Sequence, residues 1–188
     1  YPILMGPKFF AEMGLKHVST IKISNCTIEY LHHQAFEGLD DLYSVTLINV
    51  GLAIFNPDTF AQNKKLRMLT ITGNDLSIMS SVSYLLKSSS VEELDFSRNN
   101  LMELNTSAFS ELSNIVYINL SQNSLQSIPD KVFDTVATIE ELDLSYNSLK
   151  SLPSAVFNRT ALSILHLKYN LFTGDFQFGS NDLQQLDI

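Results

Sequence analysis

The chain has 188 residues and is 45% hydrophobic, which is ample for a packed core and excludes wholesale disorder. Its net charge of −8 argues against nucleic acid or an anionic membrane as a partner, because both require a basic surface. No apolar run approaches the roughly 18 residues needed to cross a membrane. The one cysteine excludes an internal disulfide framework and a thiolate zinc site.

A leucine-based unit recurs along the chain about every 24 residues. The three copies between residues 91 and 149 fit the pattern L-x-x-L-x-L-x-x-N-x-L most closely. Each copy predicts one short strand whose apolar side chains alternate inward. One repeat cannot bury its apolar face alone, so the repeats must stack. In chain order the copies begin at Val18, Leu42, Leu66, Val91, Ile115, Ile139 and Leu162.

Partial repeats are predicted at both ends. Residues 6–10 resemble residues 129–133, and residues 183–188 begin an eighth strand. We therefore expect one domain over residues 1–188, either a fragment of a longer ectodomain or a chain whose ends are covered by something else. Residues 173–182 shorten the last period to 21 residues, which predicts a local distortion.

The second half of each repeat carries its own column of aromatic side chains. Five phenylalanines each fall 18 residues after the first apolar residue of their repeat, and this register predicts a stacked spine. The members of this column are Phe36, Phe60, Phe109, Phe133 and Phe157.

The strand segments and the phenylalanine column, together with Pro129 and Pro153, resemble the extracellular "typical" leucine-rich-repeat class. Toll-like receptors, Slit-type guidance proteins and insect immune repeat proteins belong to this class. The resemblance covers essentially the full chain. It implies an α/β right-handed solenoid shaped like a horseshoe, with a parallel β-sheet on the concave face and short helices or turns on the convex face.

The resemblance also implies a ladder of inward amides just after each strand. An asparagine side chain can both donate and accept, so it satisfies backbone groups that have left the strand ladder. Val50 interrupts this column, and we expect a looser or wetter turn there. Cys26 occupies it in the first repeat, where a buried structural thiol is expected. The full column is Cys26, Asn74, Asn99, Asn123, Asn147 and Asn170.

The outward strand positions predict an acidic concave face. Residues 92–95 and 140–143 carry the same Glu-Glu-Leu-Asp sequence two strands apart, hence about 10 Å. Such a patch suits a basic protein segment, although the same sequence also serves as solvated filler in repeats of this kind. The residues predicted to contact a partner are Glu93, Asp95, Tyr117, Asn119, Glu141, Asp143, Tyr146, His166 and Tyr169.

Other reactive side chains give weaker indications. His32 and His33 could bind a metal or respond to pH, but adjacent histidines in a surface turn are usually solvated. The acidic clusters lie too far apart to supply calcium with enough ligands. No phosphate-binding glycine loop, G-x-S-x-G motif or Cys/His pair occurs. We therefore expect no enzymatic activity, no cofactor and no metal site.

Four N-x-S/T sequons begin at Asn25, Asn105, Asn119 and Asn158, where chance alone supplies roughly three. Asn105 and Asn158 lie in return segments, where a glycan can point outward. With the family resemblance, they favour an extracellular recognition module of immunity or cell-surface signalling. Its partner would be a protein ligand or co-receptor. The alternatives are a self-associating scaffold, as a homo- or hetero-oligomer, and an intracellular substrate-binding arm.

Overall fold

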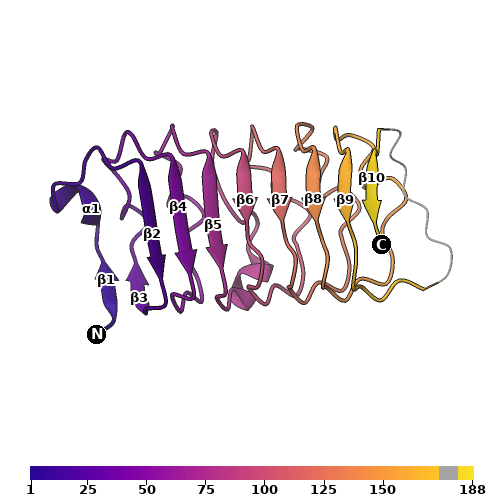
Figure 1. Ribbon diagram of the computed structural model, residues 1–188, viewed down its shortest axis with the longest axis horizontal. Coiled ribbons are helices and arrows are strands. Elements are labelled where there is room, and N and C mark those ends of the chain that lie inside the picture. The colour runs from indigo at the N-terminus through magenta and orange to yellow at the C-terminus, as the bar shows by residue number, and fades with distance from the viewer. Residues whose placement is uncertain (174–181) are drawn as a thin grey trace.

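The computed structural model describes residues 1–173 and 182–188 and has the predicted architecture, a stack of parallel strands with few helices (Figure 1). One strand per repeat joins an eight-stranded sheet, and neighbours in the sheet come from consecutive repeats. The only helices in the described ranges are the short α1 (Phe9–Glu12) and the 3₁₀ helix η1 (Ser77–Ser81). The strands are β2 (Thr20–Ser24), β4 (Ser44–Ile48), β5 (Met68–Thr72), β6 (Glu93–Asp95), β7 (Tyr117–Asn119), β8 (Glu141–Asp143), β9 (Ile164–His166) and β10 (Gln185–Asp187).

The strand register follows the repeat spacing of the sequence. Thr20 pairs with Ser44, and Ser44 pairs with Met68, each one repeat further along the chain. The last pair joins Ile164 to Gln185, which agrees with the shortened final period. The distortion predicted for 173–182 falls almost wholly outside the described residues.

A second, smaller sheet was not predicted from the sequence. Strand β1 (Ile3–Met5) pairs in parallel with β3 (Ile28–Leu31), beside the first repeat. Phe10 of α1 stacks on Phe36 with ring centroids 5.2 Å apart, so the first residues extend the aromatic spine, as their likeness to residues 129–133 suggested.

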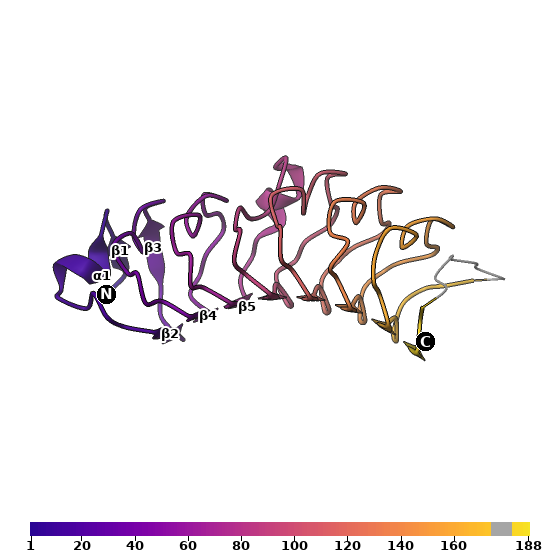
Figure 2. The ribbon, with the colours of Figure 1, turned by 90° about the horizontal axis from the view of Figure 1, so that it is seen from above.

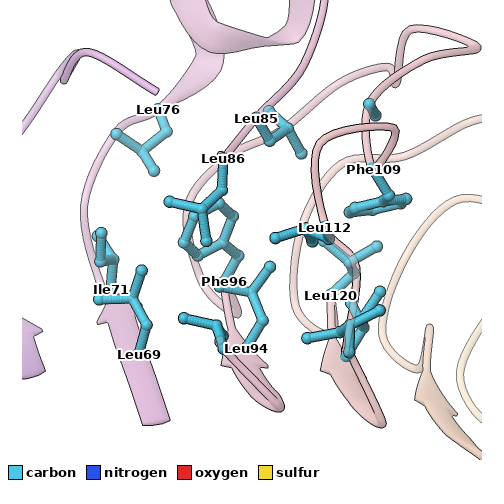
Figure 3. Packing of buried hydrophobic residues seen from close by; sticks show 14 of the residues in the cluster. Leu69, Ile71, Leu76, Leu85, Leu86, Leu94, Phe96, Phe109, Leu112 and Leu120 are labelled. Carbon is cyan, nitrogen blue, oxygen red and sulfur yellow. The ribbon is translucent and has the colours of Figure 1, made fainter. Parts of the chain in front are cut away.

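The core is one continuous column of apolar side chains between the sheet and the return segments. Ring centroids in the spine lie 5.6 Å apart for Phe109 and Phe133, and 4.7 Å apart for Phe36 and Phe60. The third repeat has no phenylalanine in this register, and Leu85 and Leu86 are buried there instead, as Figure 3 shows. The described residues contain no helix long and apolar enough to cross a membrane.

The stack is bent, and the eight strands lie along the inner side of the bend (Figure 2). The return segments, most of them turns, follow the outer side. Outward strand side chains are therefore displayed on a concave surface.

The asparagine column forms a ladder that runs from each repeat to the one before it. Asn74 shows the pattern, because its Oδ1 accepts hydrogen bonds from the N–H groups of Val50 (3.1 Å) and Leu52 (3.2 Å). Its Nδ2 donates to the carbonyl of Thr72 at 2.9 Å. Asn99, Asn123, Asn147 and Asn170 likewise accept from the preceding repeat and donate to carbonyls.

The prediction of a looser, wetter turn at Val50 is wrong. Val50 is fully buried, and its N–H is bonded to Asn74 of the following repeat. Because each amide serves the preceding repeat, the missing one would have served the turn around Cys26. There Ile28 donates to the Val50 carbonyl at 2.8 Å. Cys26 itself is only partly buried, not fully as expected, and packs against the core.

Candidate partner-binding surface

The sheet brings the predicted acidic and aromatic residues into two rows on the concave face. Strand pairing places Tyr117 between Glu93 and Glu141. In the next row, Asn119 lies between Asp95 and Asp143. The alternation of a strand sends these side chains to the face opposite the buried leucines.

Tyr117 lies in a shallow hollow of about 390 Å³ in this surface. Its walls are formed by Glu92, Glu93, Val116, Glu140 and Glu141. Burial, followed by the charges of Asp143, Asp95 and Glu141, raises the pKa of the Tyr117 phenol to about 12. The ring is therefore a neutral platform with carboxylates on both sides, which suits a cation that can also contact an aromatic face.

Several of these carboxyl groups already have partners within the chain. Asp95 Oδ1 accepts the N–H of Ser97 at 2.9 Å, and Asp143 Oδ1 accepts the N–H of Ser145 at 2.8 Å. They close the turn where each strand ends, as Asx side chains commonly do. The equivalent bond from Ser121 to Asn119 is 2.9 Å long.

The two glutamate pairs differ from these aspartates. Glu92 is neutralised by Arg67, whose Nε lies 3.0 Å from its Oε1. Glu93 and Glu140 have no ion-pair partner among residues 1–173 and 182–188. These two side chains are the carboxylates of the hollow that remain free for a partner.

His166 extends the concave surface toward β10. Strand pairing sets it beside Asp143, but its ring nitrogens face two other carboxylates. Nδ1 lies 2.8 Å from Asp187, and Nε2 lies 3.4 Å from Glu141. The hydrogen bond from His166 is the main reason that the pKa of the Asp187 carboxyl is lowered.

Two stacked tyrosines lie just beyond the ends of β8 and β9. Tyr146 and Tyr169 stack with ring centroids 4.2 Å apart, and both are exposed. Both also have a left-handed backbone, with φ of 54° and 59°. Burial and the neighbouring Tyr169 raise the pKa of Tyr146. The pair forms an apolar ledge at the rim of the concave face.

Three of the four sequon asparagines are exposed, and one is not. Asn105 and Asn158 lie on return segments, and Asn25 follows β2 with φ of 53°. Asn25 accepts a hydrogen bond from Asn49 at 3.2 Å. Asn119 is partly buried, and its Oδ1 is occupied by the Ser121 N–H. Asn105 also accepts a hydrogen bond, from the Ser107 N–H at 3.0 Å, so the preference for Asn105 and Asn158 rests on their exposure and on their place in return segments.

The rings of His32 and His33 stack on each other, with centroids 4.3 Å apart. In the described part of the chain, no group of three or more His, Cys, Asp or Glu side chains is arranged to hold a metal ion. The concave carboxylates border an open hollow, whereas glycoside hydrolysis requires one carboxyl in an apolar wall. The surface is suited to binding.

The chain is similar in fold to the ectodomains of Toll-type receptors. The structure of TLR13 in complex with ssRNA13 superposes with a TM-score of 0.79 and 21% identity, over 92% of this chain and 24% of that one. The Toll–Spatzle complex of Drosophila superposes with a TM-score of 0.72 and 22% identity, over 96% of this chain and 24% of that one. The glycosylated form of that complex superposes with a TM-score of 0.62 and 23% identity, over 89% of this chain and 25% of that one. The chain thus spans about a quarter of each.

No curated protein sequence matches the chain. The family model for the leucine rich repeat matches residues 13–76, 89–149 and 113–172, which together cover most of the sequence. Such repeats form a non-enzymatic scaffold for recognising other molecules. The chain belongs to the leucine-rich-repeat family.

Proposed function

We propose that this chain is an extracellular recognition module that binds a basic segment of a protein partner through the hollow around Tyr117. The observation that carries the proposal is a pair of glutamates, Glu93 and Glu140, that have no ion pair in the described part of the chain and lie beside a partly buried neutral aromatic ring. An interface gains most from a central aromatic anchor with complementary charge around it.

The similar structures support a role in recognition. Toll is described in complex with Spatzle, and TLR13 in complex with a single-stranded RNA. For this chain a protein partner fits better than RNA, because a net charge of −8 and an acidic concave face repel phosphate. A cell-surface or immune setting is consistent with the likeness to these receptors and with exposed sequons at Asn105 and Asn158.

Binding of a fluorescent octalysine peptide tests the hollow directly. We expect the double variant Glu93→Lys/Glu140→Lys to lower its affinity at least tenfold, since each like-charge contact opposes the peptide. The matched control is Glu29→Lys/Glu103→Lys, which makes the same charge change at exposed positions in β3 and a return segment. Asp95 and Asp143 are left unchanged because they cap backbone groups.

The outcomes separate three readings. Loss in the hollow variant alone supports the proposal. Equal loss in both variants would show that only the net charge matters, and unchanged affinity in the hollow variant would reject this surface. Secretion is tested separately by expression in a secretory host, where glycan should be found on Asn105 or Asn158. Efficient secretion with neither site modified would count against the extracellular assignment.

A further inference from the structure

A stripe of exposed apolar side chains runs along one flank of the first repeats. The position four residues after the asparagine column holds an apolar or aromatic residue in each of the first three repeats. Leu4 of β1 pairs with Tyr30 of β3 and so continues the row before the first repeat. More than half of each of these residues is exposed. The members of the stripe are Leu4 (61%), Tyr30 (53%), Ile54 (55%) and Ile78 (59%).

The stripe ends at the fourth repeat. Glu103 holds the same position there, and the fifth and sixth repeats hold Ser127 and Ser151. These residues show that the repeat does not need an apolar side chain at this position in order to fold. A contiguous exposed apolar patch on a soluble chain is typical of an interaction site. The stripe is therefore a feature that the packing of the solenoid does not explain.

A groove of about 690 Å³ lies along this stripe, and Tyr30 and Ile54 form part of its wall. Residues 27–31 of the first repeat and 51–57 of the second line it, together with Val82, which follows η1. The strands β1 and β3 and the helix η1 lie at the side of the stack toward which the strands of the main sheet point (Figure 1). The groove is thus separate from the concave hollow around Tyr117.

The charge on this flank is negative. The segments that correspond to residues 27–31 in the first four repeats contain three charged residues, and all of them are acidic: Glu29, Asp75 and Glu103. Asp75 accepts the N–H of Ser77 at 3.3 Å. Glu29 and Glu103 have no ion pair with any residue that the structure describes. A partner that fits this flank must therefore bring both apolar and basic side chains.

We propose that this flank binds an amphipathic helix of a partner protein, with the apolar face of the helix on the stripe and basic side chains beside Glu29 and Glu103. Side chains on one face of a helix recur about every 5.4 Å along its axis, and neighbouring repeats lie about 4.8 Å apart. A helix that lies across the repeats can therefore place one apolar side chain on each. The same-face side chains of an extended strand recur only about every 6.7 Å and lose this register.

Two other occupants fit the charge of this flank less well. A second copy of the chain would bring the same carboxylates and a net charge of −8, so like charges would oppose its docking. An anionic lipid surface would be repelled for the same reason. A basic amphipathic helix gains both from burial of its apolar face and from the opposite charge.

The probe is a fluorescein-labelled helical peptide of fourteen residues, stapled on its polar face, with leucine at positions 1, 4, 8 and 11 and lysine on both sides of this row. Its binding to the chain is followed by fluorescence anisotropy. The matched ligand is a stapled peptide of the same composition with the leucines distributed around the helix. We expect the matched ligand to bind at least tenfold more weakly, because it cannot place all of its leucines on the stripe.

Two variants of the chain test the surface. Tyr30→Ser/Ile54→Ser installs the residue that the fifth and sixth repeats hold at this position, so it should fold, and we expect it to lower the affinity at least tenfold. Glu29→Lys installs the residue that the sixth repeat holds at the equivalent position and should lower the affinity severalfold. The control is Met13→Ser/Leu15→Ser, which removes two exposed apolar side chains after α1 and should leave the affinity unchanged.

The proposal fails if the two peptides bind alike or if Tyr30→Ser/Ile54→Ser retains the original affinity. It also fails if light scattering shows a dimer that this variant abolishes, because a second copy would then cover the stripe. Binding of neutral phosphatidylcholine vesicles to the chain but not to the variant would overturn it in favour of a lipid surface.

The concave variant Glu93→Lys/Glu140→Lys keeps this proposal distinct from the hollow around Tyr117. It should bind the helical peptide normally, and loss of the peptide in this variant would place the helix in the hollow and overturn the proposal. Conversely, Tyr30→Ser/Ile54→Ser should bind octalysine normally, because octalysine has no apolar side chain to place on the stripe.

Discussion

The asparagine ladder predicts a large loss of stability when a single amide is removed. Asn74→Ala would leave the N–H groups of Val50 and Leu52 without an acceptor. The Thr72 carbonyl would remain paired, because the N–H of Asn49 also donates to it at 3.0 Å. Each unsatisfied buried N–H costs about 1–3 kcal/mol, so the loss of two acceptor contacts should lower the folding free energy by at least about 2 kcal/mol.

Urea unfolding measures this loss, with an expected fall in the midpoint of about 1–2 M. Because repeat stacks can unfold in parts, amide exchange gives the more local measurement. The Val50 and Leu52 amides should exchange faster, whereas the Ile118 amide in β7 should be little changed. Asn158→Ala, at an exposed asparagine, should shift stability by less than about 0.5 kcal/mol. A loss below about 1 kcal/mol in Asn74→Ala would refute the reasoning.

Three further changes follow from the packing and the charges. Gly73→Ala should destabilise the chain by about 1–3 kcal/mol, since φ is +68° and a Cβ would lie 1.9 Å from Asn49 Oδ1. The lowered melting temperature should be partly restored in Gly73→Ala/Asn49→Ala. Phe133→Ala removes a fully buried ring and should cost about 3–5 kcal/mol in urea. Absorbance titration should place the Tyr117 pKa near 12, lower in Glu141→Gln. Because folding raises the pKa of Tyr117, the contribution of this phenol to the free energy of unfolding should be complete below pH 10 and should be lost as the pH rises from 10 to 12.

The sequence predicts the order and register of the strands, because each repeat supplies one strand and the repeats begin about 24 residues apart. Leu69 and Leu94 pair across β5 and β6 although their repeats differ by 25 residues rather than 24. The additional residue is absorbed on the outer side, in the repeat that contains η1. Residue spacing therefore predicts strand register well. It does not predict the β1–β3 pair, because Ile3–Met5 lack the leucine pattern.

The candidate site was harder to predict, because acidic side chains on the concave face have two different roles. Asp95 and Glu93 both point to the concave face, yet Asp95 is bonded to its own turn, whereas Glu93 has no ion pair with any residue that the structure describes. A short carboxylate reaches the N–H two residues on, whereas a longer one does not fit that loop as well. The recurring Asp/Asn-x-Ser at the strand ends was the available signal, seen at Asp95, Asn119 and Asp143.

The second repeat departs from its neighbours at two buried positions, and the two departures have different consequences. Val50 replaces an amide in the ladder, but its own carbonyl accepts the Ile28 N–H, so that backbone group remains paired. Asn63 brings an amide into the buried position three residues after the spine phenylalanine, where the first and fourth repeats hold leucine, and its Oδ1 remains unpaired. A buried polar atom without a hydrogen-bond partner destabilises the fold. The departure at Val50 therefore leaves its turn paired, whereas the departure at Asn63 costs folding free energy.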